Sequence, residues 1–124
     1  MNSNDIHIQV RTRYLSEQSN PGESQYAFAY TITIRNLGDQ AVKLLSRHWI
    51  IKDDNDKVEE VQGPGVVGLQ PTIEPGQEFV YSSGAVIPTE FGTMQGSYEM
   101  QLTDGTRMQT PIPAFLLSQP HSVH

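Results

Sequence analysis

The stretch that decides the fold covers residues 26–35 and reads YAFAYTITIR. Its aromatic and isoleucine side chains occupy every second position, opposite alanine, threonine and arginine. Successive side chains of a β-strand point to opposite faces, so this alternation predicts a strand with one apolar face. We therefore expect Tyr26, Phe28 and Tyr30 to lie in a core.

The same period of two recurs on both sides of this stretch. It predicts further strands over residues 6–14, 94–102 and 108–112. Shorter strands are expected over 57–61, after the polar connection at 53–56, and around 79–81, after the turn Pro75-Gly76. Between them we expect loops at 16–24, 62–76 and 83–92, which are polar or rich in glycine and proline.

Residues 41–52 fit two patterns. Val42, Leu45 and Trp49 would form a helical stripe, but Ile50-Ile51 and the turns on either side favour a strand. We interpret the segment as a strand.

Two local signals refine the end of the chain. Asp104-Gly105 predicts a type I′ hairpin turn, because both residues accept the positive φ that such a turn needs. Pro111 places the last strand at a sheet edge, because proline cannot donate to a ladder.

These elements predict an all-β protein, an immunoglobulin- or fibronectin-III-like antiparallel β-sandwich of about seven strands. Trp49 lies on the third predicted strand, where such sandwiches often bury a tryptophan. Gly96-Ser97-Tyr98 followed by Met100 matches a tyrosine corner, with the methionine where the second cysteine of an immunoglobulin domain would lie.

The length of 124 residues fits one domain, with residues 1–5 and 119–124 expected to be frayed. No apolar run approaches the roughly 18 residues of a membrane span, and the first residues do not resemble a signal peptide. The chain has no cysteine, which removes disulfides, thiolate metal sites and cysteine nucleophiles. These features favour a cytoplasmic location.

The charges are distributed unevenly. The chain carries 8 basic and 14 acidic residues, yet no lysine or arginine lies between residues 58 and 106. Nucleic-acid binding and anionic membrane binding both need clustered lysine and arginine, so neither partner is expected.

Gly63-Pro64-Gly65-Val66-Val67-Gly68 matches the pattern G-x-G-x-x-G. In dinucleotide sites this pattern opens a helix whose free N–H groups meet a pyrophosphate. Here Pro71 and Pro75 exclude that helix, and the stretch holds no basic residue, so we expect neither a helix dipole nor a cationic neighbour. A structural loop is favoured, and a loop of N–H groups that binds pyrophosphate through Gly63, Gly65 and Gly68 is the alternative.

Other candidate sites are weaker. Residues 53–56 (DDND) lack the twelve-residue spacing of a calcium loop and favour a hairpin. His7, His48, His121 and His124 do not share the spacing of metal ligands in a rigid element. We expect the side chain of His48 to point away from that of Trp49. No pattern of catalytic residues is found, so we predict no enzyme, no metal and no cofactor.

Several motifs together resemble the bacterial ApaG family, also called CorD. They are NLG (36–38), SRHWII (46–51), GPGVVGLQPTIEPG (63–76), YSSG (81–84) and GTMQGSYEM (92–100), within a similarity that covers residues 6 to 117. The resemblance implies a fibronectin-III-like sandwich and an association with cobalt resistance and magnesium efflux. Related domains in eukaryotic proteins act in protein–protein contact, and the family's glycine motif, here Gly63, Gly65 and Gly68, has been likened to a pyrophosphate site. No catalytic residues carry over.

Three functions are therefore weighed. The first is a non-enzymatic interaction module with a protein partner, which docks through loops 62–76 and 83–92 if these meet at one end of the sandwich. The second is a module that binds a nucleotide or pyrophosphate at residues 63–68. The third is direct binding of Co²⁺ or Mg²⁺ by the acidic half of the chain. The first is favoured; partner and oligomeric state stay open.

Overall fold

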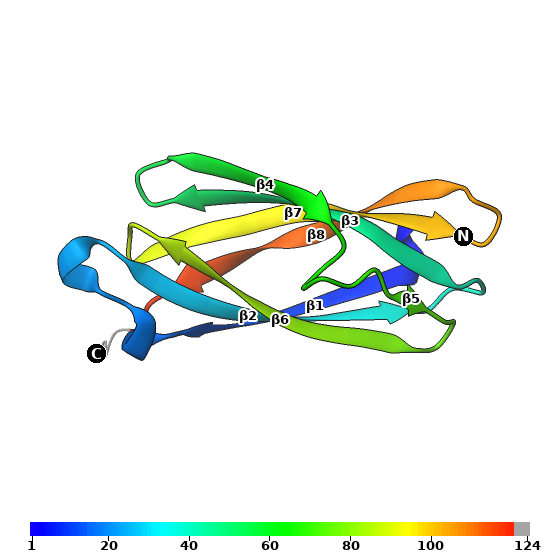
Figure 1. The fold of residues 1–124 in the computed structure, drawn as a ribbon, viewed down its shortest axis with the longest axis horizontal. Helices are drawn as coiled ribbons and strands as arrows, with labels where there is room; N and C mark the ends of the chain where they lie inside the picture. Colours follow the sequence, from blue (N-terminus) through cyan, green and yellow to red (C-terminus); the bar gives the residue numbers. More distant parts are fainter. Residues whose placement is uncertain (121–124) are drawn as a thin grey trace.

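A computed structural model describes residues 1–120 of the chain (Figure 1). Its helical segments within these residues are single 3₁₀ turns: η1 (Ser3–Asp5), η2 (Ser16–Gln18) and η3 (Pro21–Glu23). In this part of the chain no helix is long and apolar enough to cross a bilayer.

Eight antiparallel strands make up the rest of the fold. They are β1 (Ile6–Tyr14), β2 (Tyr26–Asn36), β3 (Val42–Asp53), β4 (Val58–Pro64), β5 (Thr72–Ile73), β6 (Glu78–Ile87), β7 (Phe91–Leu102) and β8 (Arg107–Ser118). One sheet has the order β1-β2-β6, and the other has the order β4-β3-β7-β8 with β5 beside the start of β3. The prediction of an all-β antiparallel sandwich is confirmed, and the eighth strand is the two-residue β5.

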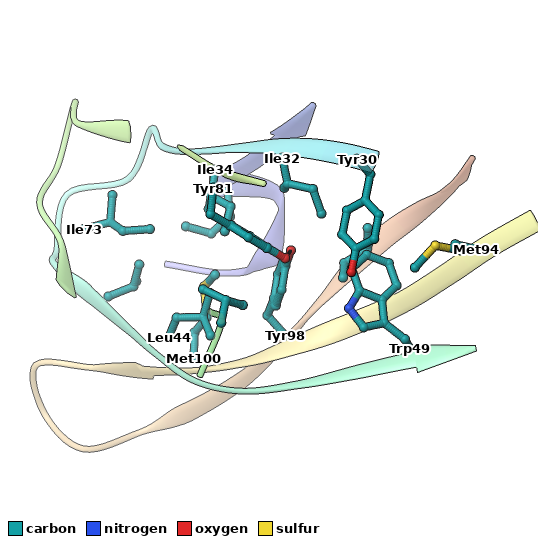
Figure 2. Packing of buried hydrophobic residues seen from close by; sticks show 14 of the residues in the cluster. Tyr30, Ile32, Ile34, Leu44, Trp49, Ile73, Tyr81, Met94, Tyr98 and Met100 are labelled. Atoms are coloured by element: carbon teal, nitrogen blue, oxygen red, sulfur yellow. Dashed lines mark hydrogen bonds between the residues drawn. The ribbon is translucent and has the colours of Figure 1, made fainter. Parts of the chain in front are cut away.

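The two sheets face each other across one apolar core (Figure 2). Tyr30 of β2 packs edge-on against Trp49 of β3, with ring centroids 5.4 Å apart, and the same indole packs edge-on against Tyr98 of β7 at 6.4 Å. Aromatic pairs prefer this edge-to-face arrangement because the positive edge of one ring meets the negative face of the other. The predicted burial of Trp49, Phe28 and Tyr30 is confirmed. Tyr26, which was also expected in the core, is half-buried.

Some sequence expectations are wrong at the ends of elements. The loop expected at 83–92 is mostly strand, because β6 continues through Ile87 and pairs with β2 along its whole length. The expected type I′ turn at Asp104-Gly105 has positive φ at Gly105 alone, and the amide of Leu102 donates to the carbonyl of Thr106, so the loop is one residue longer. Pro111 lies in the edge strand β8, as predicted.

Residues at both ends of the described chain make specific contacts, while the fraying expected for residues 1–5 and 119–124 stays a prediction. Residues 3–5 form η1, which the side chain of Asn2 caps, and the side chain of Met1 packs beside Gly38 and the core. At the other end, the amide of Gln119 donates to the carbonyl of Glu90 at 3.0 Å. Residues 121–124, including His121 and His124, lie outside the described residues.

Tyr98 does not form the predicted tyrosine corner. In that motif the hydroxyl bonds to the backbone; here the hydroxyls of Tyr98 and Tyr81 share a hydrogen bond between the two sheets, as Figure 2 shows. Both side chains are buried. Burial raises the pKa of each tyrosine far above the ordinary value, and for Tyr98 the hydroxyl of Tyr81 raises the pKa further.

This pair predicts a loss of stability at alkaline pH. Because the folded-state pKa of both tyrosines is raised, their contribution to the free energy of unfolding is complete at pH values below the unfolded-state pKa of about 10. That contribution is lost as pH rises above this value. We expect the free energy of unfolding to fall by up to about 1.4 kcal/mol per pH unit for each tyrosine above pH 10. Urea unfolding of the wild type and of the double variant Tyr81→Phe/Tyr98→Phe from pH 8 to 11 measures this.

The double variant is the matched control, because it leaves neither hydroxyl without its partner. It should show a shallower fall above pH 10 than the wild type. Equal slopes for the two proteins would contradict the assignment of the alkaline loss to this pair.

Candidate functional site

The glycine motif lies where β4 ends and the chain turns back towards β5. At this point the amide of Gly65 donates to the carbonyl of Leu45 on β3 at 2.8 Å. Gly65 has a φ of +60°, and a Cβ there would overlap the carbonyl oxygen of Leu69. No other residue type fits this position without moving the backbone.

The next four residues form a tight hairpin turn. The amide of Val66 donates to the carbonyl of Leu69, and the amide of Leu69 donates back to the carbonyl of Val66, at 2.8 and 2.9 Å. The two residues between them, Val67 and Gly68, both have positive φ, at +43° and +80°. This is the signature of a type I′ turn. We call residues 65–69 the glycine turn.

Val67 is an unusual residue for its place in the glycine turn. Type I′ turns favour asparagine, aspartate or glycine at this position, whereas a β-branched side chain with positive φ is a rare outlier. The left-handed conformation costs a residue other than glycine roughly 1–2 kcal/mol. The side chain of Val67 nevertheless projects into solvent with 52% of its surface exposed, while its neighbour Val66 is fully buried in the core.

Arg47 of β3 holds the base of the glycine turn. Its guanidinium donates to the carbonyl of Pro64 at 3.0 Å and to that of Gly65 at 3.1 Å. Gly63, which pairs with Arg47 across the β3–β4 ladder, leaves room for the guanidinium, because a Cβ there would press against it. The expectation that the motif has no cationic neighbour is therefore wrong, since the cation comes from the adjacent strand.

The three predicted glycines thus lie together but orient different groups from those a pyrophosphate site needs. Such a site converges free N–H groups on the anion. Here the carbonyls of Pro64 and Gly65 converge on Arg47, and the amides of Gly65, Val66 and Leu69 donate to backbone carbonyls. The expected lack of a helix at this motif is confirmed, and pyrophosphate binding at Gly63, Gly65 and Gly68 stays a prediction.

Two hollows lie on the side of the sandwich where β4 and β6 end their sheets, which we call the open edge. One, of about 160 Å³, lies between the glycine turn and Tyr81 and Ser83 of β6, above Trp49. The other, of about 250 Å³, lies between the start of β4 and the end of β6, with Val58 and Val86 on its rim. On the opposite side of the sandwich β1 and β8 lie beside each other.

A third hollow lies on the outer face of the larger sheet. It has a volume of about 500 Å³ and runs over Ser46, His48 and Ser97. His48 points away from the core, as expected, and its Nε2 lies 2.9 Å from a carboxylate oxygen of Glu60. The side chains that line this trough are mostly polar, and Gln109 donates to Glu99 within it at 3.3 Å, whereas the open edge exposes the apolar Val58, Val67 and Val86.

Residues 88–90, the part of the expected 83–92 loop that lies between β6 and β7, do not meet the glycine turn at one end, contrary to the condition on which the predicted docking surface rested. The glycine turn is bonded to Leu45 near the start of β3, whereas Thr89 accepts a hydrogen bond from the amide of Asp54 just past its end. Nine residues of strand separate these points, or roughly 30 Å. The segment that approaches the glycine turn is Ser83, within strand β6.

The acidic half of the chain spreads its carboxylates over several elements. Glu78 pairs with Arg35 at 2.7 Å, Glu60 with His48 at 2.9 Å and Glu99 with Arg107 at 3.1 Å. Among residues 1–120, no three histidine or acidic side chains gather as a metal site would need. The run at 53–56 forms the hairpin between β3 and β4, as predicted. Direct metal binding stays a prediction.

Comparisons with known proteins agree on one family. A family model described as the ApaG domain matches residues 16–102. A Protein ApaG of Pseudomonas putida strain F1 is 56% identical over 119 residues, which cover 96% of this chain and 94% of the relative. A Protein ApaG of Ralstonia nicotianae is 52% identical over 124 residues and covers the whole of both chains.

A solved structure supports the same relationship. A crystal structure of an ApaA protein from Bordetella pertussis superposes on this chain with a TM-score of 0.91 and 46% sequence identity. The match covers 95% of this chain and 96% of that one.

The geometry of the glycine turn predicts unequal effects for two of its glycines. Gly65→Ala should lower the free energy of unfolding by about 2–4 kcal/mol, because the Cβ meets backbone in addition to the cost of positive φ. Gly68→Ala is the matched control: it has open space and bears the cost of positive φ alone, about 1 kcal/mol. Urea unfolding checks both values, and equal losses would contradict the packing described for Gly65.

Proposed function

This chain belongs to the ApaG family, and we propose that it works as a non-enzymatic interaction module that docks a partner protein through the glycine turn. The observation that carries the proposal is the conformation of Val67. An exposed β-branched residue is held at positive φ, where asparagine or glycine would be more stable. Local strain of this kind clusters at functional sites, where a side chain is kept for what it contacts.

The surroundings of Val67 fit a docking role. Leu69 at the end of the turn is also 53% exposed, so the two side chains present adjacent apolar surface. The bonds from Gly65 to Leu45 and from Arg47 to the turn fix the position of both side chains before any partner arrives. A preorganised apolar tip binds with less loss of conformational entropy than a flexible loop would.

We place the family's association with cobalt resistance and magnesium efflux downstream of this contact, in the cytoplasm. In this proposal the module acts on metal levels through its partner rather than by holding the ion. The carboxylates Glu60, Glu78 and Glu99 support it, because each is already engaged by a basic or histidine side chain.

The variant Val67→Asn tests the proposal with two opposite readouts. Asparagine suits the type I′ turn, so the free energy of unfolding should rise by about 1 kcal/mol. Capture of partner proteins from an extract of Pseudomonas putida, quantified by mass spectrometry, should at the same time fall clearly below that of the wild type. A gain in stability with a loss of binding is the pattern of a residue retained for function.

Two control variants separate docking from general surface effects. Val67→Ile keeps a β-branched apolar tip and should keep the partner. Leu116→Asn removes an equally exposed apolar side chain on β8, away from the open edge, and should also keep it. The proposal fails if the wild type retains no protein reproducibly, or if Val67→Asn retains the same proteins in equal amount.

A further inference from the structure

Besides the two-residue β5, four strands end the two sheets, and three of them carry features that prevent edge pairing. β8 contains Pro111 and Pro113, β4 carries Glu59 and Glu60, and β1 carries two arginines and lies beside β8. Prolines, charges and covering elements are the usual protection of sheet edges. β6 has no proline, and its single charged residue is Glu78 at its first position, paired with Arg35.

The unpaired backbone groups of β6 follow from the ladder that it makes with β2. The amide of Asn36 donates to the carbonyl of Gln77, and hydrogen-bonded pairs alternate along an antiparallel ladder. The odd-numbered residues of β6 therefore bond to β2, and the even-numbered ones point their N–H and C=O groups outward. Gly84 and Val86 belong to this outward set, in the half of β6 that borders the larger hollow of the open edge.

That hollow suits a side chain of an added strand. It has a volume of about 250 Å³, with Ile51 and Ile87 in its lining and the exposed side chains of Val58 and Val86 at its rim. An extended peptide paired with β6 would place alternate side chains towards the hollow.

The charges around β6 indicate the kind of peptide. No lysine or arginine lies between residues 58 and 106, but Arg35 of β2 pairs with Glu78 at the start of β6, and Arg47 of β3 lines the smaller hollow beside Tyr81 and Ser83. The acidic surroundings of β6 are therefore those of its second half, at the larger hollow. The hollow itself is lined by Asp53 and Glu59 against Lys57. A second copy of this chain would bring its own net charge of −6 to the contact, whereas a basic segment would be attracted to it.

We propose that the outer edge of β6 binds an extended, basic segment of a partner protein, which adds to the sheet as a further strand with alternating apolar residues. This inference rests on the proposed function, since it names the part of the partner that docks beside the glycine turn.

Selection of random displayed peptides of about ten residues against the immobilised full chain tests the proposal. Enriched peptides should alternate apolar residues with lysine or arginine. A synthetic peptide of the enriched sequence should bind Val86→Pro about tenfold more weakly than the wild type, because proline removes an outward N–H and blocks the edge. The control Val86→Thr keeps the amide and strand propensity and should stay within about threefold of the wild type.

A modified peptide keeps the test valid if circular dichroism shows that Val86→Pro does not fold. Alternate amides of an extended peptide point to opposite edges, so N-methylation of every second amide removes the donors of one edge only. Of the two peptides methylated in this way, the one that loses the donors facing β6 should not bind the wild type. The proposal is overturned if no peptide is enriched, if enriched peptides are acidic, or if neither Val86→Pro nor methylation of either edge weakens binding.

Two further outcomes would show which of the two proposals is wrong. A wild-type dimer in sedimentation velocity that Val86→Pro converts to a monomer would show that a second copy occupies the edge, and would overturn the proposal. A partner that is lost with Val67→Asn but retained in full with Val86→Pro would overturn the strand-addition proposal alone, and would leave the interaction module standing.

Discussion

The attachment of the glycine turn to strand β3 is the interaction on which the candidate site depends. The amide of Gly65 bonds to the carbonyl of Leu45, and the guanidinium of Arg47 bonds to the carbonyls of Pro64 and Gly65. Charge-assisted hydrogen bonds of this kind are stronger than those between neutral groups. They fix the backbone so that Val66 enters the core and Val67 is forced outward with an unfavourable φ.

The sandwich itself determines where a partner can reach the sheets. β1 and β8 lie beside each other on one side, while β4 and β6 on the other side leave hollows between the sheets. The glycine turn crosses this open edge on its way from β4 to β5 (Figure 1). An exposed apolar tip and an unprotected strand edge therefore lie on the same side of the molecule, which is the physical basis for assigning them to one docking surface.

Much of the fold follows from the sequence because the signals are local. The alternation in residues 26–35 predicts β2, and the tryptophan and Pro111 are correctly placed in the core and at an edge. The second half of β6 was missed because its small residues, Ser82 to Ala85, resemble a loop in composition. Their pairing with Ala29 and Thr31 of β2, a contact distant in sequence, makes them a strand.

The candidate site was only partly predictable for a similar reason. The glycine motif is visible in the sequence, but Arg47 lies 16 residues before Gly63 and joins it across the β3–β4 ladder. Lys52 pairs with Val58 across residues 53–57, and counting outward from that pair brings Arg47 opposite Gly63. A count from a hairpin at residues 53–56 alone would bring Arg47 opposite Gln62, so the register could not be read from the sequence to the residue. The type I′ conformation of Val67-Gly68 had no signal in the sequence, because valine disfavours it. Likewise, the hydroxyl bond between Tyr81 and Tyr98 depends on how the two sheets pack.

Hydrogen–deuterium exchange of the full chain, alone and with the protein that it retains from extract, tests the central claim most directly. The open edge is the proposed docking side, so bound partner should slow exchange in residues 65–69 and in the second half of β6. Slowed exchange confined to β1 and β8, or to the outer face of the larger sheet around His48, would contradict it.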